Sequence, residues 1–87
     1  MVTRLYAVRD SKLNEYNQPY SLANDEVAKR VLSMAVNDSK KSMMTQYPSD
    51  YDLYWIGEYN SVSGEVIACK PVHVCSASSL VEQSSGS

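Results

Sequence analysis

The stretch YDLYWIGEY, residues Tyr51–Tyr59, organises the rest of the chain. Tyrosine, tryptophan, isoleucine and leucine favour the half-buried, pleated surface of a β-strand. Residues 48–50 and 60–64 bound the stretch with proline, asparagine, serine and glycine, which form turns. Strict alternation puts Tyr51, Leu53, Trp55, Gly57 and Tyr59 on one face and Asp52, Tyr54, Ile56 and Glu58 on the other. Because both faces carry large apolar groups, we predict an inner strand.

Weaker strand signals lie on both sides of this stretch. Val2–Arg9 alternates well enough for a first strand. A short second strand is predicted around Tyr16, and Pro19, which has no N–H, restricts this segment to an edge strand or an extended loop. Residues 65–70 and 72–77 predict a last strand that Pro71 interrupts.

One helix is predicted, from Asp25 to about Asn37. Asn24 is a suitable N-cap because its side chain accepts hydrogen bonds from the first free N–H groups. An apolar stripe follows the helical period and consists of Val27, Ala28, Val31, Leu32, Ala35 and Val36. Residues 39–50 show little periodicity and are expected to form a loop.

These elements predict one small α+β domain over residues 1–77. One helix packs on a mostly antiparallel sheet of three to four strands, in the order strand, weak strand, helix, strand, strand. Residues 78–87 are rich in serine and are expected to form a flexible tail, in which only Leu80 and Val81 would dock weakly on the domain. A chain of 87 residues buries a small core, which dimerisation would supplement.

The charge of the chain restricts the classes of partner. The formal net charge is -2, which excludes a strongly basic nucleic-acid-binding domain. Residues 1–41 nevertheless carry +2 and residues 42–87 carry -4, so a basic face is compatible with the overall acidity. No apolar run approaches the length of a membrane span, and we expect no membrane association.

Residues that suggest catalysis or metal binding are few. Asp50 and Asp52 form a carboxylate pair, but acids at the entry to a strand usually cap turns, and no partner for acid–base chemistry is evident. Cys69, His73 and Cys75 share the parity of a regular strand, and zinc accepts both residue types. The two cysteines would lie about 20 Å apart on a strand, too far for one ion or a disulfide. We therefore expect free thiols, no metal, no cofactor and no enzymatic activity.

Trp55 raises the question of which face of the sheet the helix covers. If Tyr54 and Ile56 face the helix, Trp55 lies on the uncovered side. There it would serve a dimer interface or a stacking platform for bases. The alternative is a loop or tail that folds over the ring.

Several blocks of the sequence together resemble a known family. They are LYAVRDSK (Leu5–Lys12), PYS (Pro19–Ser21), AVND (Ala35–Asp38), YPSDYDLYWIGEYN (Tyr47–Asn60) with Gly64, and PVHVCSA (Pro71–Ala77). In this order they resemble the small nonstructural protein of the gokushoviruses (Gokushovirinae), the subfamily of Microviridae with circular single-stranded DNA genomes. That family typically has VRDSK, AVN at the helix end, HPEDYDL, IGEF or IGEY, and a closing run similar to PVHLA. The chain departs from it at Trp55, where the family has a more variable and often polar residue.

The resemblance implies a non-capsid accessory protein of a bacteriophage, made in the cytoplasm of the host bacterium. Members are often described as DNA-binding, with a role in genome synthesis or packaging. The family's pattern supplies no catalytic or ligand residue.

Two hypotheses about function follow. The first is binding of single-stranded DNA without sequence specificity, by phosphate neutralisation and base stacking. Its candidate residues are Arg4, Arg9, Lys12, Lys29, Arg30, Lys40 and Lys41 for phosphates, and Tyr6, Tyr54 and Trp55 for bases. The second is a protein-interaction module, expected as a homodimer, that binds a host or viral protein through the Trp55 face or a sheet edge.

Overall fold

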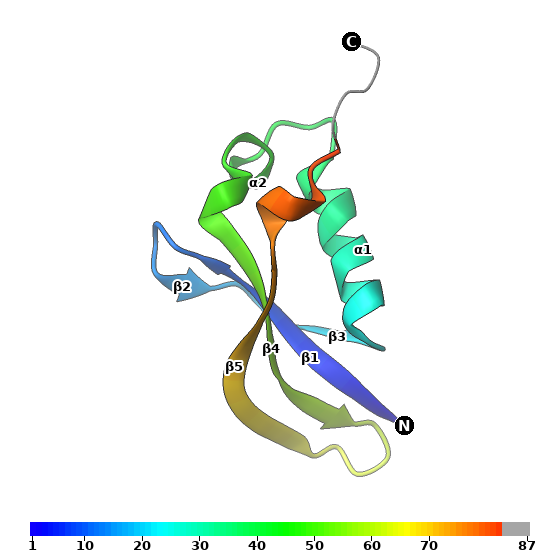
Figure 1. The fold of residues 1–87 in the computed structure, drawn as a ribbon. Coiled ribbons are helices and arrows are strands. Elements are labelled where there is room, and N and C mark those ends of the chain that lie inside the picture. The colour runs from blue at the N-terminus through cyan, green and yellow to red at the C-terminus, as the bar shows by residue number, and fades with distance from the viewer. Residues whose placement is uncertain (83–87) are drawn as a thin grey trace.

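The computed structural model describes residues 1–82 and confirms a single α+β domain (Figure 1). The strands are β1 (Val2–Asp10), β2 (Glu15–Tyr16), β3 (Tyr20–Leu22), β4 (Tyr51–Asn60) and β5 (Val66–Ser76). The helices are α1 (Asp25–Val36) and α2 (Met43–Gln46), with 3₁₀ turns η1 (Pro48–Asp50) and η2 (Ala77–Leu80).

The strands form one antiparallel sheet in the order β2-β1-β4-β5, and β3 pairs with β1 beside β2. The described sheet therefore has five strands, whereas the sequence predicts three to four. Pro19 lies just before β3, where its missing N–H costs no ladder hydrogen bond, so the chain resumes pairing at Tyr20. The predicted inner strand is confirmed, because β4 pairs with β1 on one side and β5 on the other.

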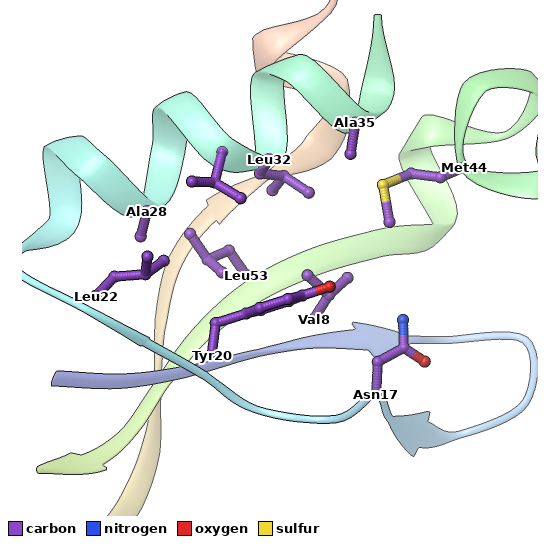
Figure 2. Close-up of a pocket in the computed structure, with 10 residues that line it drawn as sticks. Val8, Asn17, Tyr20, Leu22, Ala28, Leu32, Ala35, Met44 and Leu53 are labelled. Carbon is purple, nitrogen blue, oxygen red and sulfur yellow. The ribbon is translucent and has the colours of Figure 1, made fainter. Parts of the chain in front are cut away.

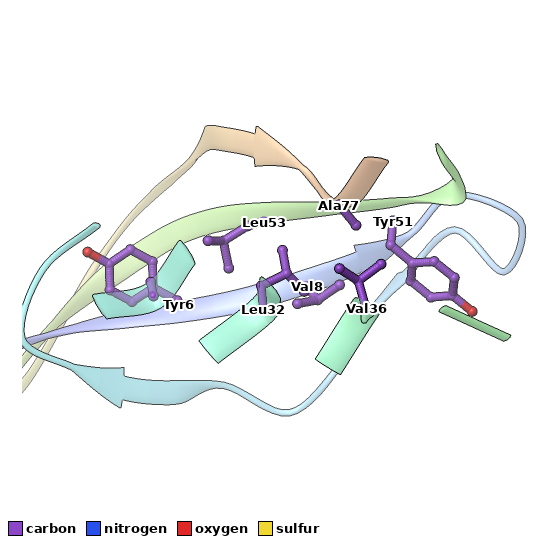
Figure 3. Packing of buried hydrophobic residues seen from close by; sticks show 8 residues of the cluster. Tyr6, Val8, Leu32, Val36, Tyr51, Leu53 and Ala77 are labelled. Carbon is purple, nitrogen blue, oxygen red and sulfur yellow. The ribbon is translucent and has the colours of Figure 1, made fainter. Parts of the chain in front are cut away.

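Helix α1 begins where the sequence predicts. The Asn24 side chain accepts a hydrogen bond from the Val27 N–H at 3.0 Å. The helix buries Ala28, Leu32 and Val36 against β1 and β4 (Figure 3). The other half of the predicted stripe lies at the surface, where Val31 is 37% exposed while Leu32 is 3% exposed.

The core lies between α1 and one face of the sheet. The buried cluster comprises Tyr6, Val8, Ala28, Leu32, Val36, Tyr51, Leu53 and Ala77. Met44 of α2 and Leu80 of η2 pack against this cluster, so all of these elements cover the same face. We call the opposite face of the sheet the open face.

A β-bulge at Ile56 interrupts the alternation of β4. Leu5 pairs with Gly57 and Tyr6 pairs with Trp55, so Ile56 has no partner on β1. The face assignment is therefore wrong beyond Trp55: Gly57 lies opposite Leu5, on the open face. A Cβ atom at Gly57 would meet the carbonyl oxygen of Ile67 at 2.4 Å, which shows how closely β5 approaches β4 here.

Two segments are more structured than predicted. The expected loop over residues 39–50 contains α2, which Ser42 and Thr45 close with a reciprocal capping box, and η1, which begins at Pro48. The domain also extends past residue 77. The Asn37 side chain donates to the Leu80 carbonyl at 2.9 Å and accepts from the Glu82 N–H at 2.8 Å, which ties residues 78–82 to α1. Residues 83–87 of the predicted tail lie outside the described residues.

The hairpin that joins β4 to β5 extends away from the helices (Figure 1), and the molecule measures 50 × 27 × 20 Å. Val62, Val66 and Ile67 are exposed on this arm. Within residues 1–82, no helix has the length and apolar character to cross a membrane.

Candidate functional site

Trp55 lies on the face that α1 covers, so the arrangement in which Tyr54 and Ile56 would face the helix does not occur. Its ring packs against the core, and its indole N–H donates to the Gly57 carbonyl at 2.8 Å. The Arg4 guanidinium covers the ring, with its central carbon 4.4 Å from the centroid. The side chain is half-buried, so neither an open stacking platform nor a covering tail describes it.

Arg4 and Tyr6 converge on Asp25 in the first turn of α1. The Arg4 guanidinium donates to Asp25 Oδ1 at 3.0 Å and the Tyr6 hydroxyl donates to the same oxygen at 2.6 Å. Tyr6 is 0% exposed, and burial raises the pKa of its hydroxyl, an effect that the hydrogen bond to Asp25 increases. The predicted stacking role of Tyr6 is therefore wrong, because no face of its ring is accessible.

The open face carries a row of three rings from three strands. The Tyr54 ring of β4 contacts Tyr16 of β2 at a centroid distance of 5.5 Å and His73 of β5 at 5.4 Å, both edge to face. Tyr16 is 45% exposed and the His73 side chain is 50% exposed. Ala7, opposite Tyr54 on β1, is buried on this face. We call Tyr16, Tyr54 and His73 the aromatic row.

Polar side chains lie beside the aromatic row. Asp52, two residues before Tyr54, has its Oδ1 3.0 Å from His73 Nε2. On β1, Arg9 pairs in register with both Asp52 and Tyr16, and its guanidinium donates to the Asn14 side chain. The open face thus combines exposed rings with one acidic and one basic group.

The remaining basic candidates are spread over several elements. Lys12 is exposed in the β1–β2 turn, near Arg9 and Tyr16. Lys29 and Arg30 lie on α1 and line a shallow hollow together with Glu26 and Glu82. Lys40 and Lys41 lie in the segment between α1 and α2. Among the predicted residues, the open face therefore brings together Arg9 and Tyr54, with Lys12 at its border.

A small apolar pocket lies between α1, α2 and β3 (Figure 2). Its volume is about 50 Å³, and Tyr20, Leu22, Ala35 and Met44 are among its lining residues. Ligand sites for small molecules are typically several hundred Å³. The pocket is therefore an imperfection in the packing at the edge of the core rather than a metabolite site.

His73 and Cys75 point to opposite faces of β5. His73 pairs with Tyr54 on the open face and Cys75 pairs with Leu53 on the helix face, with Val74 as an extra residue between them. The common face expected for Cys69, His73 and Cys75 is therefore wrong. Both cysteines are free thiols, and burial raises the pKa of Cys75.

Sequence reasoning missed Tyr16 and His73 as partners of Tyr54. The only signal for Tyr16 is an aromatic side chain in a weak strand, and His73 offers none beyond its parity with Cys69 and Cys75. The order of the strands and their register depend on pairing between distant segments. The pattern of a single strand therefore does not predict the aromatic row.

Comparison with known proteins identifies the family. Residues 3–80 match the family model described as Phage ORF5 protein. The chain belongs to the Phage ORF5 protein family. No curated protein and no solved structure matches it. This membership confirms a phage protein, as the resemblance implied, and the matched region includes η2, in agreement with a domain that continues past residue 77.

Proposed function

We propose that this phage protein is a non-enzymatic accessory protein of the gokushovirus type that binds single-stranded DNA through the open face of its sheet, in the host cytoplasm, during genome replication or packaging. The observation that carries the proposal is the aromatic row. Three rings on neighbouring parts of one sheet face provide π-faces for bases, and base–aromatic stacking is tolerant of sequence.

Arg9 and Lys12 supply the phosphate contacts of this proposal. Arg9 is in register with Tyr16, and Lys12 lies in the turn that links their strands. Two such contacts give a modest salt dependence, because each neutralised phosphate contributes about 0.7 to the slope of log K against log salt. A weak, salt-sensitive interaction also agrees with a net charge of -2.

Fluorescence anisotropy with a labelled oligothymidylate of about 15 nucleotides tests the proposal. Tyr16→Ala and Tyr54→Ala should each weaken binding by about 1–3 kcal/mol, with little change in the salt slope. Arg9→Gln should lower both affinity and slope. Tyr47→Ala is the matched control, since Tyr47 is an exposed tyrosine before η1, outside the row. Absence of binding by the wild type at low salt would refute the proposal.

A second candidate function is a homodimeric protein-interaction module. The observation that favours it is the exposed arm, where Ile67 is 63% exposed on β5, the last strand of the described sheet. An unprotected edge strand is a template for pairing with another chain. Sedimentation velocity distinguishes this candidate: a dimer that Ile67→Glu dissociates supports it, whereas a monomeric wild type excludes self-association. Val62→Glu, in the turn of the same arm, is the control.

A further inference from the structure

We propose that Asp52 recognises a guanine base placed beside Tyr54, so that the open face prefers guanine over the other three bases. This inference rests on the proposed binding of single-stranded DNA and adds a base preference to it. It starts from the position of one carboxylate among the aromatic rings.

The register of the sheet aligns two transverse rows on the open face. One contains Tyr16, Arg9, Asp52 and Ser76, and the next contains Ala7, Tyr54 and His73. Asp52 therefore lies next to the ring surface on which a base would stack. Its side chain is 27% exposed, so solvent and ligands can reach it while the sheet shields much of it.

His73 holds the Asp52 carboxylate in place. Its Nε2 lies 3.0 Å from Oδ1, and the same imidazole packs against Tyr54. Among the described side chains, the second oxygen, Oδ2, has no hydrogen-bond partner. Arg9, although opposite Asp52, directs its guanidinium to Asn14. The carboxylate is thus oriented and retains acceptor capacity on both oxygens.

Guanine is the base that matches such an acceptor. A carboxylate accepts hydrogen bonds through two oxygens and donates none. The Watson–Crick edge of guanine presents two donors side by side, N1–H and the N2 amino group, which can bond both oxygens at once. Adenine and cytosine place one amino donor beside a ring acceptor, and thymine places one N–H between two carbonyl oxygens. In these three bases an acceptor would face a carboxylate oxygen, which is repulsive.

The test compares four oligonucleotides of about 15 nucleotides, each an oligothymidylate with dG, dA, dC or dT at its centre. The wild type should bind the dG oligonucleotide about tenfold more tightly than the dT one, as expected for a two-bond contact to a base edge. Asp52→Asn, which offers one acceptor and one donor, should abolish this difference. Asp50→Asn, an acid just before β4, is the matched control and should retain it.

A competition measurement needs no variant and covers the case in which Asp52→Asn does not fold. Guanosine monophosphate should displace labelled oligothymidylate from the wild type at about tenfold lower concentration than thymidine monophosphate. Equal affinity for all four oligonucleotides would overturn the inference and leave DNA binding intact. A dG preference that persists in Asp52→Asn would also overturn it. Absence of binding to every oligonucleotide would refute both this inference and the proposed function.

Discussion

The central carbon of the Arg4 guanidinium lies 4.4 Å from the centroid of the Trp55 ring. The same guanidinium donates a hydrogen bond to Asp25 Oδ1 at 3.0 Å. One side chain of β1 therefore links β4 to the first turn of α1. Stacking of a guanidinium on a tryptophan is a favourable cation–π arrangement. It also shields the ring, and Arg4 is thereby engaged within the protein rather than free to contact a ligand.

The first prediction concerns this shielding. Trp55 is the only tryptophan beside seven tyrosines, so fluorescence excited selectively at tryptophan reports on it alone. Arg4→Ala should shift the emission maximum to longer wavelength and increase quenching by acrylamide, because water reaches the uncovered ring. Arg30→Ala, which removes an exposed arginine from α1, should change neither. Identical spectra for Arg4→Ala and wild type would show that the stacked geometry does not persist in solution.

The second prediction separates two neighbouring residues of α1. Leu32→Ala should lower the free energy of unfolding by about 2–5 kcal/mol, because Leu32 is buried in the core. Val31→Ala should cost less than about 1 kcal/mol, because its side chain already contacts solvent. Urea unfolding of both variants measures the difference. Equal losses would mean that the helix is rotated relative to the sheet.

The third prediction concerns the close approach of β5 to β4. In Gly57→Ala the new methyl group would clash with the Ile67 carbonyl, so the strands must separate, at a cost of at least about 2 kcal/mol. Hydrogen exchange should accelerate at the amides of the arm. Gly64→Ala is the control: its φ is +78° and no atom lies within 4 Å, so only backbone strain of about 1 kcal/mol is expected. A smaller loss for Gly57→Ala than for Gly64→Ala would contradict the geometry.

The fourth prediction concerns alkaline pH. Burial raises the pKa of Tyr6 and of Tyr51, with further contributions from Asp25 and Asp10 respectively. Above about pH 10, the ordinary tyrosine value, the folded protein therefore retains more protons than the unfolded chain. The free energy of unfolding that these two hydroxyls contribute is fully present below that pH. It is lost as the pH rises through their pKa values in the folded protein.

Urea midpoints measured from neutral pH to about pH 11 test this dependence. The variant Tyr6→Phe should lose less stability with rising pH than the wild type, since phenylalanine does not ionise. Exposed Tyr47→Phe should follow the wild type. A Tyr6→Phe curve parallel to that of the wild type would show that the pKa of the Tyr6 hydroxyl is the same in the folded and the unfolded protein.

Local sequence signals predicted the elements that depend on neighbouring residues. Asn24 marks the start of α1, and the aromatic stretch marks β4. The single turn of α2, which Ser42 and Thr45 cap in the structure, carries too little periodicity to be recognised from the sequence. The α+β class followed from these elements and their order.

The sequence by itself determined the helix and the long strands, because caps, turn residues and hydrophobic period act over a few positions. The interruption predicted at Pro71 is wrong, since β5 runs from Val66 to Ser76 as one strand, with a register shift between Ala68 and Val72. Only the tertiary structure decided which face of β4 receives α1, since both faces carry large apolar side chains. It placed Leu53 opposite Val8 under the helix and Tyr54 on the open face beside Tyr16 and His73. The bulge at Ile56 placed Gly57 opposite Leu5, and the register of β5 placed His73 opposite Tyr54. These features arise from pairing between distant segments, and a shift of one residue moves every side chain to the opposite face.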